Sequence, residues 1–306
     1  MVLLSRSSSL AVLALASSTL AAPSPVKREP EYRTLRGQLP DTVVVDWVGP
    51  QIQHITVTEE QLAQNNLTEA PPSQISPPTL SERGVFGADD RQLWPNTEYP
   101  YSAMGKLQWS NGVFCSGTLV GPRHVAAAKH CAPTDSSVSV RFSPNFYDTE
   151  RAGGAYVTSI ISLGGYSVEN PNPTSCDWKE DWAVFILDSP LGNAQGYFGA
   201  KLIDDSLTGK PIFFNWGYPG DLANGARPYR SSGSTVQPSP YSCDAYGPYI
   251  TDTDVAGGQS GGPFWIYEGD TRYLYAVCSG TSSANSIFSG GNNLLSTILS
   301  ARNDYP

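Results

Sequence analysis

From residue 84 to the end of the 306-residue chain, short apolar runs alternate with turn residues, and this alternation limits the possible folds more than any other feature. The runs are rich in Val, Ile, Tyr, Phe and Thr, which favour strands. The chain also holds 29 Gly and 25 Pro, which interrupt helices and favour tight turns. We therefore predict a mostly β protein.

Charge and hydropathy exclude two kinds of partner. The 28 acidic residues outnumber the 19 basic ones, for a net charge of -9. A negative chain is repelled by phosphate, so neither nucleic acid nor an anionic membrane surface is an expected partner. No apolar run reaches the roughly 18 residues that a membrane-spanning helix needs.

The first 21 residues have the pattern of a secretory signal peptide. Arg6 precedes an apolar stretch at 10–16, and small residues end at Ala21, where a signal peptidase would cut. A short buried helix is the alternative. Export predicts a secreted, extracellular protein in an oxidising compartment, where cysteines can pair.

Residues 22–83 differ from the rest and are predicted to be a propeptide. They contain no Cys, they carry a dibasic pair at 27–28, and they end in a Pro-rich stretch at 70–79 that is typical of a linker. Asn66 lies in the one glycosylation sequon. The alternative is a small accessory domain. The remaining residues, 84–306, form the predicted main domain.

Three motifs carry possible chemistry, around His130, Asp181 and Ser260. A hydroxyl is a poor nucleophile unless a base removes its proton; an imidazole does this near neutral pH, and a carboxylate fixes its tautomer. The three residues supply one group of each type. Gly258 and its neighbours at 257–262 permit an irregular turn in which the N–H groups of Gly258 and Ser260 form an oxyanion hole.

The order His, Asp, Ser distinguishes between known schemes. Residues 258–262 also match the G-x-S-x-G elbow of α/β-hydrolases, but that scheme needs a His after the Ser, and no His follows His130. The chain has no H-E-x-x-H pair, so zinc hydrolysis is unsupported and we expect no catalytic metal and no cofactor. Whether a loop binds a calcium ion stays open, because no residue spacing identifies such a site.

The motifs, together with residues 85–91, 99–101, 217–221 and 254–263, resemble the chymotrypsin-like serine proteases and, within them, the secreted glutamyl endopeptidases. The resemblance implies an all-β fold of two antiparallel six-stranded barrels with the active site between them, followed by a C-terminal helix. The spacing of the apolar residues at 294–299 favours that helix.

The resemblance also assigns five substrate-binding residues, which are Asp254, Val255, Cys278, Ser279 and Gly280. Cys278 stands where glutamyl endopeptidases have His, and Val255 where they have Thr, so the preferred side chain stays open. Asp254 is either a cation selector or a structural residue bonded to loop amides. Ser279 is expected to hydrogen-bond Asp181.

Five cysteines cannot all pair with one another. The resemblance implies a disulfide between Cys115 and Cys131. Three single pairings remain among Cys176, Cys243 and Cys278, and we favour Cys243 with Cys278.

The resulting hypothesis is a secreted, monomeric serine endopeptidase that cleaves polypeptides through an acyl-enzyme. Its own propeptide would inhibit it until cleavage after Arg83. Because Gln259 is neutral, it cannot form the ion pair that orders the oxyanion loop of trypsin-like proenzymes. The alternative is a non-catalytic binding protein that uses the surface of the barrels. The enzyme requires that folding bring the three motifs into one hydrogen-bonded line.

Overall fold

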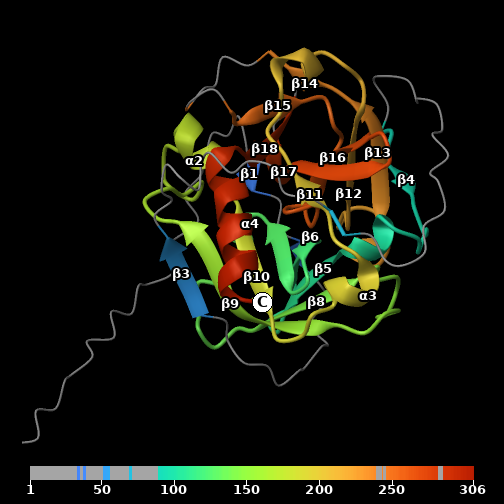
Figure 1. Cartoon of the computed structure of the whole chain (residues 1–306), viewed down its shortest axis with the longest axis vertical. Coiled ribbons are helices and arrows are strands. Elements are labelled where there is room, and N and C mark those ends of the chain that lie inside the picture. Colours follow the sequence, from blue (N-terminus) through green and yellow to red (C-terminus); the bar gives the residue numbers. More distant parts are fainter. Residues whose placement is uncertain are drawn as a thin grey trace, which may run out of the picture.

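Strands dominate the structure and form two sheets, one built mainly from the first half of the main domain and one from the second (Figure 1). The computed structural model describes residues 89–306 except 239–242, 244–245 and 282–284, together with the short stretches 33–34, 37–38, 51–55 and 69–70. The predicted signal peptide and the sequon at Asn66 lie outside the described residues.

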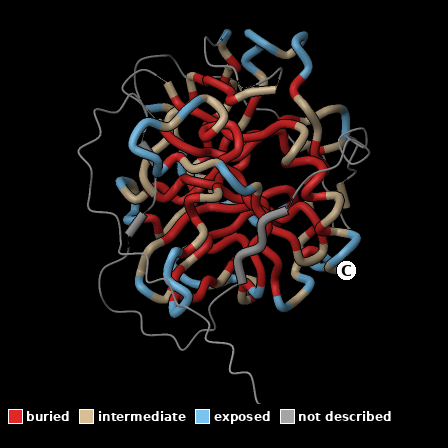
Figure 2. The backbone as a smooth tube through the Cα atoms, turned by 90° about the vertical axis from the view of Figure 1, so that its left-hand side faces the viewer, coloured by how far each residue is buried: buried red, intermediate tan, exposed pale blue. Residues whose placement is uncertain are grey.

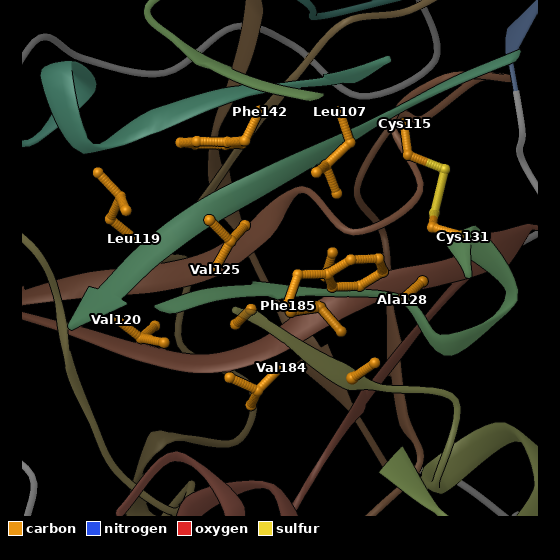
Figure 3. Packing of buried hydrophobic residues seen from close by; sticks show 14 of the residues in the cluster. Leu107, Cys115, Leu119, Val120, Val125, Ala128, Cys131, Phe142, Val184 and Phe185 are labelled. Atoms are coloured by element: carbon orange, nitrogen blue, oxygen red, sulfur yellow. A yellow bond between two sulfur atoms is a disulfide. The ribbon is translucent and has the colours of Figure 1, made fainter. Parts of the chain in front are cut away.

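The first barrel is closed by hydrogen bonds all the way round. Its antiparallel strands pair in the order β10-β7-β6-β5-β8-β9, and β9 pairs back onto β10. The strands are β5 (Met104–Trp109), β6 (Val113–Gly121), β7 (His124–Ala127), β8 (Val140–Pro144), β9 (Ala155–Leu163) and β10 (Ala183–Leu187). Side chains such as Leu107, Val125 and Phe185 fill its interior (Figure 3).

The second barrel is a half-barrel, because no pairing joins β13 to β14 among the described residues. Its antiparallel order is β14-β15-β18-β17-β16-β12-β13, and Thr235 alone separates β13 from β14 along the chain. Two short strands, β4 (Gln92–Leu93) and β11 (Gly199–Ala200), add to β13 and β17. The barrel strands are β12 (Phe213–Gly217), β13 (Tyr229–Ser234), β14 (Val236–Gln237), β15 (Tyr249–Thr251), β16 (Pro263–Glu268), β17 (Thr271–Thr281) and β18 (Ser286–Gly290).

The predicted C-terminal helix is confirmed as α4 (Asn292–Asp304), which runs along the first barrel (Figure 1). Leu294, Leu295 and Ile298 are fully or almost fully buried in the large apolar cluster. His124 Nε2 lies 2.9 Å from the carbonyl oxygen of Ala301 and ties β7 to the helix. Burial lowers the pKa of His124 to about 4, so His124 is a neutral structural residue near neutral pH.

The other helices are single turns in the connections, and the buried chain is concentrated inside the barrels, with exposed residues at the periphery (Figure 2). None of the helices among the described residues combines the length and the apolar character that a membrane span requires. The short helices are η1 (Tyr101–Ala103), η2 (Lys129–Cys131), α2 (Ser175–Lys179), α3 (Gly192–Gln195), η3 (Asp205–Leu207) and η4 (Ala223–Gly225).

One of the two predicted disulfides is present and the other is wrong. Cys115 and Cys131 are joined, which links β6 to η2 (Figure 3). Cys243 pairs with Cys176 at the start of α2, and not with Cys278. Cys278 is a free thiol on β17, completely buried among the apolar side chains of the second barrel. Its side chain serves as an apolar core residue of the second barrel.

Three short strands before residue 84 add to the barrels. β1 (Arg33–Thr34) pairs antiparallel with β17, and β2 (Gly37–Gln38) pairs antiparallel with β6. β3 (Gln51–Ile55) pairs in parallel with β9 over five residues. The predicted propeptide therefore contacts both barrels.

Candidate active site

His130, Asp181 and Ser260 lie in one hydrogen-bonded line where the two barrels meet. His130 lies in η2 after β7, Asp181 just before β10, and Ser260 just before β16 of the second barrel. His130 Nδ1 is 2.7 Å from Asp181 Oδ2, and His130 Nε2 is 2.7 Å from Ser260 Oγ. All three residues are buried. The fold therefore brings the three motifs into the hydrogen-bonded line that the enzyme hypothesis requires.

Asp181 is held at both carboxylate oxygens. Its Oδ1 accepts a hydrogen bond from the backbone N–H of His130 at 2.9 Å. Its Oδ2 accepts from the His130 ring and from the hydroxyl of Ser279, so the contact predicted for Ser279 is present. Since the carboxylate accepts at Nδ1, the ring carries its proton there, and Nε2 is left to accept the proton of Ser260.

The nucleophile loop needs glycine at two places. Gly258 and Gly261 have φ of +97° and +80°, in the left-handed region. A Cβ atom on Gly258 would lie 2.3 Å from both the Phe114 ring and the Tyr218 carbonyl oxygen. Gly258 and Ser260, the residues of the predicted oxyanion hole, both lie in this loop, and their role stays a prediction.

Two barrel strands fix the same loop. On the first barrel, the Ser116 N–H donates to the Ser260 carbonyl at 2.8 Å, and the Ser116 hydroxyl donates to the Gly258 carbonyl at 2.9 Å. On the second, the Gly261 N–H donates to the Cys278 carbonyl at 2.7 Å. Ser260 is therefore clamped between β6 and β17.

Arg91, which the sequence motifs do not single out, supplies a cation beside the neutral Gln259. Its guanidinium donates to Gln259 Oε1 at 3.1 Å and forms ion pairs with Asp89 and Asp221. The same Gln259 oxygen accepts from the Ala256 N–H at 2.9 Å. Because Gln259 is neutral, its position before Ser260 indicates that another residue must supply the charge that orders the nucleophile loop.

Replacing Arg91 with Met is expected to lower kcat for peptide hydrolysis roughly tenfold. A hydrogen bond to a charged group contributes about 1.5–3 kcal/mol, and part of that loss loosens the oxyanion loop. Steady-state kinetics checks this, with Arg227→Met as the matched control because Arg227 forms an exposed ion pair with Asp148. Equal effects of the two substitutions would contradict the assignment.

The predicted substrate-binding residues divide into two groups. Asp254 Oδ2 accepts the backbone N–H of Asp90 at 3.0 Å, which agrees with the structural alternative for Asp254. Val255 packs against the apolar cluster of the second barrel, in which Cys278 is buried. Ser279 and Gly280 lie on β17, next to the catalytic line.

Asp90 gives a pH-dependent prediction. Burial and the nearby Asp254 carboxylate raise the pKa of Asp90 to about 6. Because a raised carboxyl pKa favours the protonated folded state, stability is lost as pH rises through 6. Asp90→Asn is expected to raise the free energy of unfolding at pH 8 by about 1 kcal/mol, discounted for partial exposure. Urea unfolding should show the gain disappearing towards pH 4; a constant gain would contradict this.

Two antiparallel barrels that meet at a Ser–His–Asp line define the chymotrypsin-like class of hydrolase. The family model described as Trypsin matches residues 95–292, more than half of the chain. The chain therefore belongs to the trypsin family of serine endopeptidases, as the resemblance implied.

Among known proteins, the chain is 29% identical to the glutamyl endopeptidase of Bacillus licheniformis over 279 residues, which are 89% of this chain and 84% of the relative. A solved structure of a Glu endopeptidase in complex with MPD matches 72% of this chain and all of its own, with 22% identity and a TM-score of 0.58. Human heparin binding protein shares the fold at 16% identity and a TM-score of 0.52, over 72% of this chain and 98% of its own.

Proposed function

We propose that the chain is a secreted serine endopeptidase that is made as a proenzyme and works through His130, Asp181 and Ser260. The observation that carries the proposal is the pair of 2.7 Å contacts that join the three side chains. Family membership supports polypeptides as substrates.

In the first half of the reaction, Ser260 Oγ attacks the carbonyl carbon of the substrate while His130 Nε2 accepts its proton. The N–H groups of Gly258 and Ser260 donate to the oxyanion that forms, and loss of one such donor typically costs about 10²–10³ in rate. His130 then gives the proton to the departing amine, which leaves an acyl group on Ser260.

In the second half, water attacks the acyl-enzyme and His130 again accepts a proton. Asp181 stabilises the imidazolium in both halves through its hydrogen bond at Nδ1. His130 then returns this proton to Ser260 Oγ as the acid product leaves, which restores the Ser260 hydroxyl.

The proenzyme part of the proposal concerns residues 1–83. Residues 1–21 would be removed on export, Asn66 would carry glycan, and residues 22–83 would inhibit the enzyme until cleavage after Arg83. The pairing of β1, β2 and β3 with the barrels supports an inhibitory role. N-terminal sequencing of the mature protein tests the boundary, and a start far from Gly84 would contradict it.

The competing function is a binding protein without activity. A likeness to human heparin binding protein shows the fold alone, so the fold does not decide between the two. A serine-directed phosphonate and a peptide library, applied to the processed monomer, do decide. We expect labelling of Ser260 and cleavage with a measurable side-chain preference; failure of both would favour the binding protein.

A further inference from the structure

Two strands from the predicted propeptide pair with different barrels although only two residues separate them. β1 lies on β17, with Arg33 opposite Thr281 and Thr34 opposite Gly280. β2 lies on β6, with Gly37 opposite Phe114 and Gln38 opposite Val113. The chain therefore crosses from the second barrel to the first between residues 34 and 37.

The register on β17 leads towards the catalytic residues. Because the pairing is antiparallel, the step from residue 33 to 34 moves from Thr281 to Gly280. The next residues along β17 in that direction are Ser279, which donates to Asp181, and Cys278, whose carbonyl accepts from Gly261.

The pairing register of β2 on β6 also leads towards the catalytic residues, from the first barrel. The step back from residue 38 to 37 moves from Val113 to Phe114. The next residues along β6 are Cys115 and Ser116, and the Ser116 N–H donates to the Ser260 carbonyl. The two ladders therefore converge on Ser260.

The connection between β1 and β2 is short, which limits the distance between the two strands. Three consecutive Cα–Cα steps, from residue 34 to residue 37, span at most about 11 Å. Residues 34 and 37 are therefore held close together on β17 and β6, the two strands that clamp Ser260.

We propose that residues 33–34 and 37–38 occupy the substrate groove of the enzyme with the polarity of a substrate, the first pair before Ser260 and the second pair after it. The proposal rests on the proposed function. It defines the groove as the edge of β17 at 279–281 together with the edge of β6 at 113–114. The partner that fits is an extended polypeptide, held by main-chain pairing, with its N-terminal side on β17 and its C-terminal side on β6.

Contacts on the C-terminal side of this segment keep it in place. β3 pairs with β9, and further along the Tyr99 hydroxyl donates to Glu69 Oε2 at 2.7 Å. The Arg272 N–H also donates to Glu69, and Ala70 exchanges two backbone hydrogen bonds with Tyr197. A tethered segment has a millimolar effective concentration, so it blocks the groove even when its own affinity is weak.

Disulfide trapping in the full chain tests the register. Ser260→Ala is added to prevent cleavage, and two pairs are introduced separately: Arg33→Cys with Thr281→Cys, and Gln38→Cys with Val113→Cys. Residues opposite each other on paired strands suit a disulfide, whereas neighbours along a strand point to the other face. The matched controls are therefore shifted by one residue: Thr34→Cys with Thr281→Cys, and Gly37→Cys with Val113→Cys.

We expect both direct pairs to oxidise at least tenfold faster than their shifted controls, with unchanged circular dichroism. Equal rates for direct and shifted pairs, or no trapping of either direct pair, would overturn the proposal. Disulfide formation needs no catalysis, so its result is independent of the proposed function. Failure of the proposed function is detected separately, as a lack of phosphonate labelling of Ser260 in the processed protein.

A second measurement tests occupancy of the groove. In the uncleaved chain with the Gln38–Val113 positions cross-linked and Ser260 retained, phosphonate labelling of Ser260 is expected to be at least 100-fold slower than in the processed protein. Labelling at the same rate in both would overturn occupancy, even if the cross-link forms.

Discussion

Replacement of Ser260 by Ala is expected to lower kcat for peptide hydrolysis by about 10⁶-fold, because the nucleophile and the base act as one unit. Residual hydrolysis should come only from substrate binding and the oxyanion hole. The Ser260 hydroxyl contacts His130 at 2.7 Å, while the loop is fixed by backbone bonds to Ser116 and Cys278. The variant should therefore keep the fold. Kinetics of the processed protein and urea unfolding check both statements.

Ser139→Ala is the matched control. Ser139 is also completely buried, and its hydroxyl has no hydrogen-bond partner among the described residues. We expect its removal to leave kcat within a factor of two of the wild type. Ser260→Ala protein that still hydrolyses peptides at more than about one thousandth of the wild-type rate would exclude Ser260 as the nucleophile.

The sequence was sufficient for the features that local pattern determines. Short apolar runs between turn residues predicted strands, and the spacing at 294–299 predicted α4, because each signal is contained in a few neighbouring residues. The three motifs were recognisable because their chemistry restricts residue type and order. The line that joins His130, Asp181 and Ser260 then followed from the fold that the resemblance implied.

Features that depend on distant contacts could not be predicted. Cys243 pairs with Cys176 at the start of α2, and no local pattern distinguishes Cys176 from Cys278. Arg91 contacts Gln259 across 168 positions of sequence. Asp254 could be assigned to either of two roles until its bond to the Asp90 backbone was seen. In each case the deciding partner lies on another element.

Asp181→Asn is expected to lower kcat by about 10⁴-fold while preserving the positions of the other residues. In the wild type, Oδ1 accepts from the backbone N–H of His130, which cannot become an acceptor. The amide oxygen of the variant must therefore face that N–H. Its NH₂ group then faces His130 Nδ1 and donates to it, which moves the ring proton to Nε2. A ring protonated at Nε2 cannot accept the proton of Ser260.

Ser279→Ala separates this tautomer effect from a general loss of hydrogen bonding at the same carboxylate. It removes the other side-chain donor to Oδ2 but leaves the His130 contacts intact. One hydrogen bond to a charged group corresponds to about 1.5 kcal/mol, so a roughly tenfold fall in kcat is expected. Comparable losses in Asp181→Asn and Ser279→Ala would contradict the tautomer argument. A loss at least 100-fold greater in Asp181→Asn would establish that Asp181 acts by fixing the proton on Nδ1. Ser279→Ala removes one hydrogen bond to the carboxylate, whereas Asp181→Asn replaces the acceptor that faces His130 Nδ1 with a donor.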